Sequence, residues 1–242
     1  MPFAHSSDAG QTASLRKVIG FRFMRSMLGW VVVGWVICCQ AFSQQAAQTK
    51  ERPTVTFTCD FPGSEPDHYF LSIASDGAAS YDSTGKLTKD SEDGDPYRFD
   101  FVASEATRER VFDLAKKAGY FEGKIDSGNK KLAPMGMKTL TYTDLQRSTH
   151  TVYNYSPVPA VEELTRLFQG MAMTLEFKRR LEYEYHYQKL ALDEELKRME
   201  EMKQAGSLTE IAAVVPILQK IANDPALINV ARTRAQRLMN GN

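Results

Sequence analysis

Hydrophobic and polar residues alternate along the first folded part of the chain, which is the period of a half-buried β-strand. The earliest such segment is 55–61, and two more, 68–75 and 78–81, flank Asp76-Gly77. Because Asp-Gly between two alternating segments is a strong hairpin signal, we expect a type I′ turn there. The pattern therefore predicts the start of an antiparallel sheet.

A charged loop, 83–96, separates this hairpin from a fourth alternating segment at 97–102. Ser104 is then expected to cap a helix that reaches about Ala118. Acidic residues lie early in this helix and lysines lie late, as the helix macrodipole favours. Gly119 is the expected stop.

A second hairpin is predicted from two further segments, 138–144 and 149–155. After it, prolines end the strand, and a proline can open a helix because its missing N–H is not needed there. Apolar residues at helical spacing then predict one helix without a breaker from Pro159 to Ala205. Gly206 is its expected end.

The second half of that long helix, 176–205, is dominated by charged residues and keeps only a thin apolar stripe. Two shorter helices, 208–222 and 225–239, follow. A fold-back of these helices onto the long helix would bury their apolar faces. A stripe of this kind otherwise pairs with an unknown protein partner or a second copy. The candidate interaction surface consists of Leu181, Tyr185, Leu192, Leu196 and Met199.

These elements together predict an α+β fold. An antiparallel sheet with helices on one face is followed by a long charged helix and a C-terminal helical hairpin. The α+β domain is expected at 54–173 and the helical tail at 174–242, after a flexible leader at 44–53.

The segment 1–43 has the parts of an export signal. Its apolar core, Leu28–Cys39, is twelve residues long, well short of the roughly 20 needed to cross a bilayer as a helix. Arg22 and Arg25 precede this core, and a small–large–small cleavage pattern follows it. The residues at the expected cut are Ala41, Ser43 and Gln44. We therefore expect a periplasmic or secreted protein.

Two points about this segment stay open. An uncleaved signal would anchor the protein in the inner membrane through 24–43. The polar stretch before the apolar core is long for a signal peptide, so Met1, Met24 and Met27 are all candidate starts. The only cysteine after the signal is Cys59, which alternates with apolar residues and is expected to be buried.

Charge excludes one class of function. The chain has 30 basic and 30 acidic residues. Without the segment before Gln44, 26 basic and 29 acidic residues remain. Because a mildly acidic body gives no electrostatic reason to bind phosphate backbones, no nucleic-acid partner is expected.

The sequence contains no nucleophile elbow, phosphate-binding glycine loop or His-Glu-x-x-His motif. His68 and His150 lack a second ligand at metal-binding spacing, so no catalytic residue and no cofactor is assigned. An acidic loop is a candidate calcium site, although it lacks the spacing of an EF-hand. Its residues are Asp90, Glu92, Asp93 and Asp95.

Residues 54–171 resemble a family of secreted bacterial domains of unknown function. The resemblance rests on HYFLSIASDGAASY, YRFDFVASEATRERVFDLAKKAGYF, KTLTYTD and PVPAVEELTRLFQGM. It implies an exported bacterial domain and carries no catalytic residues over. Residues 208–239 separately resemble a single helical pair of the HEAT type, whose units need neighbours to cover their apolar faces.

The sequence thus favours an exported accessory or protein-interaction module. The alternative is an envelope protein that binds a small ligand or an ion. An enzyme with an unrecognised site is the least favoured class.

Overall fold

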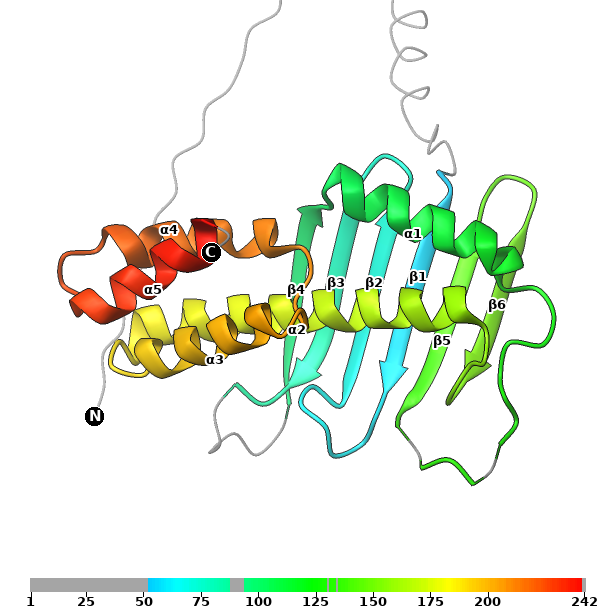
Figure 1. Cartoon of the computed structure of the whole chain (residues 1–242), viewed down its shortest axis with the longest axis horizontal. Coiled ribbons are helices and arrows are strands. Elements are labelled where there is room, and N and C mark those ends of the chain that lie inside the picture. Colours follow the sequence, from blue (N-terminus) through cyan, green and yellow to red (C-terminus); the bar gives the residue numbers. More distant parts are fainter. Residues whose placement is uncertain (1–51, 88–93, 130, 134, 241–242) are drawn as a thin grey trace, which may run out of the picture. The chain divides into compact units, whose positions relative to one another are not determined.

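The computed structural model describes residues 52–87, 94–129, 131–133 and 135–240. Six strands form one antiparallel sheet in the order β4-β3-β2-β1-β5-β6 (Figure 1). The strands are β1 (Thr54–Asp60), β2 (His68–Ala74), β3 (Ala78–Gly85), β4 (Asp95–Val102), β5 (Met137–Thr143) and β6 (Ser148–Tyr153). The helices are α1 (Glu105–Lys117), α2 (Pro159–Tyr187), α3 (Leu192–Gln204), α4 (Val215–Asn223) and α5 (Asn229–Asn240), with 3₁₀ turns η1 (Gly119–Phe121) and η2 (Ile211–Val214). The predicted α+β fold is confirmed.

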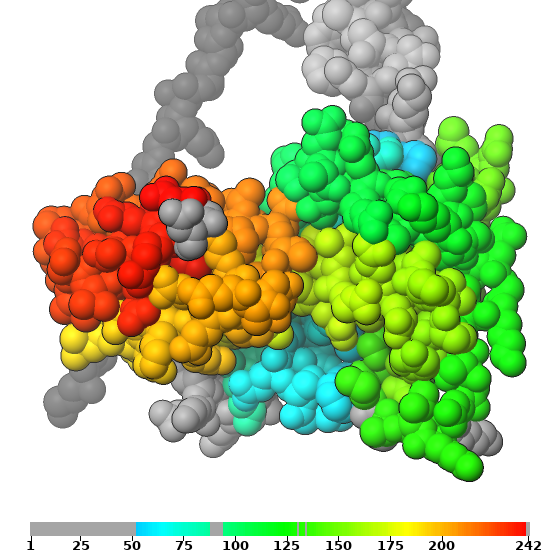
Figure 2. All heavy atoms as spheres, in the orientation of Figure 1, coloured from blue at the N-terminus to red at the C-terminus, as the bar shows by residue number. Residues whose placement is uncertain are grey.

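Helices α1 and α2 cover one face of the sheet (Figures 1 and 2). Alternate strand residues such as Val55, Phe57 and Leu71 point towards them and are fully buried. The Phe57 ring stacks on that of Phe168 in α2, with 5.2 Å between ring centres. The main core therefore lies between the sheet and these two helices, as alternation with period two requires.

The Asp76-Gly77 hairpin forms, but with a different turn from the one predicted. The Gly77 amide donates to the carbonyl of Ala74 over 2.9 Å, and Gly77 has φ of +92°. Asp76 is not among the residues with positive φ, so a type I′ turn is wrong. The geometry is that of a type I turn followed by a left-handed glycine, the usual three-residue hairpin loop.

The next two strands are longer than the sequence indicated. β3 continues to Gly85 and β4 already begins at Asp95, where the sequence predicted a loop over 83–96. Cross-strand pairing extends to Gly85 opposite Asp95. Polar residues in these positions form strand because the ladder supplies backbone hydrogen bonds whatever the side chain.

The single helix predicted from Pro159 to Ala205 is also wrong, because it breaks after Tyr187. A turn at 188–191 reverses the chain, and α3 then begins at Leu192 with three acidic residues in its first turn, a favourable position in the helix macrodipole. α2 and α3 therefore form an antiparallel helical hairpin. The terminal helices pack on it, α5 against α3 and α4 against α2 and α5.

This packing gives the apolar stripe a role inside the chain. Leu181, Leu192, Leu196 and Met199 are fully buried in a second core with α4 and α5, and Tyr185 packs against that core. They were predicted as an interaction surface, and the structure corrects this. The reversal at 188–191 turns one half of the stripe towards the other, and α4 and α5 cover both halves, so the predicted fold-back of the terminal helices is confirmed.

The tail is also tied to the sheet domain. Ser104 caps α1 as predicted, with its hydroxyl accepting from the Thr107 amide over 3.3 Å. Glu210, from the segment after α3, accepts hydrogen bonds from the Ser104 amide and hydroxyl at 3.0 and 2.9 Å. Because α2 also runs through both cores, the predicted boundary at residue 173 falls inside a continuous helix.

The predicted signal segment 1–43, with its cleavage residues Ala41, Ser43 and Gln44, lies outside the described residues. Among the helices of the described part, none combines the length and the hydropathy needed to cross a bilayer.

Candidate functional site

The candidate calcium site falls largely outside the described residues. Only Asp95 is described, as the first residue of β4, and its backbone carbonyl accepts from Arg179 over 2.8 Å. The described ranges contain no group of three or more side chains suited to hold a metal ion. The calcium hypothesis therefore stays a prediction about the segment around Asp90, Glu92 and Asp93.

A buried polar network joins α2 to β3. One carboxylate oxygen of Glu176 accepts from the hydroxyls of Tyr81 and Ser83, both at 2.7 Å. Its other oxygen lies 3.7 Å from the Arg179 guanidinium, which also donates to the carbonyl of Gly85. Burial and the Glu176 charge raise the pKa of Tyr81, so its hydroxyl keeps the donated proton. Among the described residues both hydroxyls are engaged with Glu176, and one buried Nη of Arg179 has no hydrogen-bond partner, so we interpret the network as a structural tie between α2 and β3.

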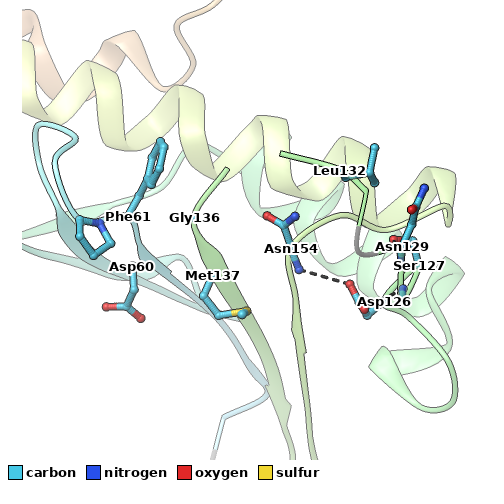
Figure 3. Close-up of a pocket in the computed structure, with 11 residues that line it drawn as sticks. Asp60, Phe61, Asp126, Ser127, Asn129, Leu132, Gly136, Met137 and Asn154 are labelled. Atoms are coloured by element: carbon cyan, nitrogen blue, oxygen red, sulfur yellow. Dashed lines mark hydrogen bonds between the residues drawn. The ribbon is translucent and has the colours of Figure 1, made fainter. Parts of the chain in front are cut away.

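The first large cavity lies where β1 and β5 meet the segment before β5 (Figure 3). It has a volume of about 690 Å³ and we call it the loop cavity. Asp60 and Phe61 line it from the end of β1, while Asp126 and Asn129 line it from the segment after η1. Asn154 closes it beyond β6, with its backbone amide 3.3 Å from the Asp126 carboxylate.

A buried lysine holds the wall of this cavity in place. Lys138 is almost wholly buried, and its ammonium donates to the carbonyls of Met135, Gly136 and Asn154 at 2.9, 3.1 and 3.0 Å. Burial lowers the pKa of Lys138, but all three donors are satisfied by carbonyl oxygens. The side chain of Asn154 also accepts from the Met135 amide over 2.9 Å. Met135 and Gly136 are therefore held against Lys138 and Asn154 by hydrogen bonds.

A second cavity, of about 570 Å³, lies between the β1–β2 connection, α2 and α3, and we call it the α2–α3 cavity. Phe61 belongs to the lining of both cavities. Met173 and Phe177 line it from α2, and Met202 from α3. In the space-filling view, the cyan atoms of the first two strands and their connection emerge next to α2 and α3 (Figure 2).

Exposed apolar side chains gather around these two cavities. Their exposed fractions run from 39% for Phe61 and Met173 to 67% for Met135. Large apolar side chains left in water mean little singly, but a group around a concave surface marks a binding site. We call this group the apolar rim. It consists of Phe61, Leu132, Met135, Met137 and Met173.

Two arginines form the polar end of the α2–α3 cavity. Arg180 of α2 and Arg198 of α3 both bind the buried carboxylate of Glu195, at 2.5 and 2.9 Å. Their guanidinium carbons lie 4.8 and 6.0 Å from the centre of the Phe177 ring. Nearby, burial and then the charge of Glu195 raise the pKa of Glu184 to about 7.

Two other reactive side chains, Cys59 and His68, lie at or beside the lining of these cavities. Burial raises the pKa of the Cys59 thiol, which keeps it in the unreactive protonated form and agrees with its predicted burial. His68 binds Asp60, with 2.5 Å between Nδ1 and Oδ1, and both side chains are about half exposed. Within the described residues, no serine or cysteine joins that pair by a hydrogen bond.

Compared with known proteins, the chain matches no family model and no curated protein. The resemblance of residues 54–171 to a family of secreted domains therefore stays a prediction.

Sequence reasoning missed both cavities. Their lining comes from chain segments far apart in the sequence, and single methionines or arginines carry no motif. One signal was present in the Met135-Gly136-Met137 segment, where Met135 precedes β5 and Met137 is an apolar residue at an exposed position of β5. These two exposed methionines beside Gly136 are the local feature of the sequence that indicates the cavities.

Proposed function

We propose that this protein is an exported interaction module that binds a segment of another protein in the groove made by the loop cavity and the α2–α3 cavity. The observation that carries the proposal is the apolar rim, which places five large exposed side chains around two cavities that share Phe61. Methionine and phenylalanine are typical of surfaces that accept varied apolar side chains.

The shape of the groove favours a chain segment over a compact ligand. Small-molecule sites usually enclose most of the ligand surface in one pocket of roughly 300–1,000 Å³. Here two cavities of about 690 and 570 Å³ share Phe61 in their lining, and the side chains of their rim are exposed to water. Because Lys138 and Asn154 hold Met135 and Gly136 by hydrogen bonds, binding would cost little ordering at that part of the groove.

The proposal is tested by site-specific photo-crosslinking in the cells that make the protein. A photoreactive amino acid replaces Met173, and in a second strain Met135, so that each probe lies on the apolar rim. The matched control replaces Leu145, which is 72% exposed but lies in the turn beyond the far end of β5. We expect a discrete crosslinked product from both rim positions and none from Leu145.

Equal products from rim and control positions, or none from any of them, would overturn the groove as a binding site. The export part of the proposal is tested separately, by fractionating the same cells. Recovery of the protein from the cytoplasm alone would contradict export and would not affect the proposed binding in the groove.

A further inference from the structure

The arginine pair at the end of the α2–α3 cavity has unused hydrogen-bonding capacity. Arg180 contacts Glu195 through Nε, and Arg198 through one Nη. In the part of the chain that the structure describes, no acceptor binds either Nη of Arg180 or the second Nη of Arg198. A guanidinium offers its donors as a planar fork that fits a carboxylate.

The charges around this pair leave a positive excess. Two guanidinium groups share one carboxylate, that of Glu195, which is buried while the Arg198 side chain is 55% exposed. Burial raises the pKa of the nearby Glu184 to about 7, so near neutral pH it carries only part of a negative charge. Glu176 also lines the cavity, but its carboxylate is occupied by Tyr81, Ser83 and Arg179.

The other carboxylate of the cavity does not cancel this excess at contact distance. Glu65 lies exposed on the β1–β2 connection, and no ion pair joins it to Arg180 or Arg198 among the described residues. An anion entering the cavity therefore meets donors that are already held in place. The Phe177 ring is fully buried and packs beside both guanidinium groups, which helps to hold them in place.

We infer that Arg180 and Arg198 form a carboxylate-binding subsite, so that the bound partner segment carries an aspartate or glutamate next to the apolar side chains that fill the groove. The inference rests on the proposed binding function and adds the chemistry of the partner. The charge of the arginine pair selects the acidic residue, and the apolar rim selects its hydrophobic neighbours.

The test is a selection of random 12-residue peptides displayed on phage against the full-length protein. The same selection is made on Arg198→Gln, on Met173→Lys and on the control Arg237→Gln. Arg237 is matched to Arg198, because it is 49% exposed and binds the carboxylate of Glu200 over 2.8 Å, but it lies on α5. Circular dichroism confirms that each variant folds.

On the wild type and on Arg237→Gln we expect peptides enriched in Asp or Glu beside Leu, Ile, Phe or Met. On Arg198→Gln the acidic enrichment should vanish while the apolar enrichment stays. On Met173→Lys the apolar enrichment should fall. Acidic enrichment that is unchanged on Arg198→Gln would overturn the subsite and leave the groove intact. Peptides that are the same on the wild type and on Met173→Lys would overturn the groove itself.

One selected peptide is then measured by fluorescence polarisation, with its acidic residue and with the corresponding amide. Loss of a charge-assisted hydrogen-bonded pair should weaken binding by about tenfold or more. Combining the amide peptide with the Arg198→Gln protein should weaken binding no more than either single change does. Additive losses would show that the two groups do not meet. Displacement of the peptide by dodecanoate with equal affinity would instead indicate a small amphiphilic carboxylate and overturn the peptide partner.

Discussion

Removing the carboxylate of Glu176 tests how the sheet domain and α2 are held together. Glu176 is 6% exposed and accepts two hydroxyl hydrogen bonds of 2.7 Å. Its second oxygen is 3.7 Å from Arg179, whose Nη1 is buried without another partner among the described residues. Glu176→Ala therefore leaves two hydroxyls without their acceptor and the buried Arg179 guanidinium without its counter-charge.

The expected loss in the free energy of unfolding depends on the groups that lose their contact with Glu176. Breaking a buried ion pair by removing one partner costs about 3–5 kcal/mol, because the other charge stays buried and uncompensated. Glu176→Gln keeps an acceptor oxygen for Tyr81 and Ser83 and loses only the charge, so about 1–3 kcal/mol is expected. The order of stability is wild type, then Glu176→Gln, then Glu176→Ala.

The free energy of unfolding is measured by urea denaturation with circular dichroism, using the m-value to check that the transition stays cooperative. Glu201→Ala is the control, because Glu201 is exposed on α3, and its effect should stay within about 0.5 kcal/mol. A loss below about 1 kcal/mol for Glu176→Ala would show that the network is not the tie between α2 and β3.

Four further predictions address other parts of the chain. Gly77→Val should lower the free energy of unfolding by about 1–3 kcal/mol, because Gly77 has φ of +92°, and an unchanged urea midpoint would contradict this. The pKa of Glu184 is raised from its ordinary value of 4.5 to about 7 in the folded chain. Between pH 4.5 and about 7 the folded chain therefore keeps a proton on Glu184 that the unfolded chain loses, so the contribution of Glu184 to stability falls as the pH rises through this window. The free energy of unfolding of Glu184→Gln should therefore rise relative to that of the wild type from pH 4.5 to 7. Parallel curves of stability against pH would refute the raised pKa of Glu184. Deleting 208–242 uncovers the second core, so the truncated chain should aggregate or self-associate. A truncated chain that stays monomeric with α3 still helical would contradict this prediction. N-terminal sequencing of exported protein should start at or near Gln44, and recovery of an intact 31–36 segment would show that the signal is not cleaved.

The sequence alone determined most of the secondary structure of the sheet domain. Alternation over 55–61, the Asp-Gly pair and the Ser104 cap are local signals, and the strands, the hairpin and α1 form where they indicate. Such signals act between residues a few positions apart, and tertiary contacts did not override them. The wrong turn type at Asp76-Gly77 shows the limit, since one positive φ there suffices for a three-residue loop.

The tertiary structure decided how the long charged segment is used. Leu181 and Leu196 lie on one apolar stripe in the sequence, and only the reversal at 188–191 brings its two halves together in a core. The same reversal places Arg198 beside Arg180 and creates the α2–α3 cavity. A cavity depends on which surfaces meet across distant parts of the chain, and residue spacing does not encode that meeting.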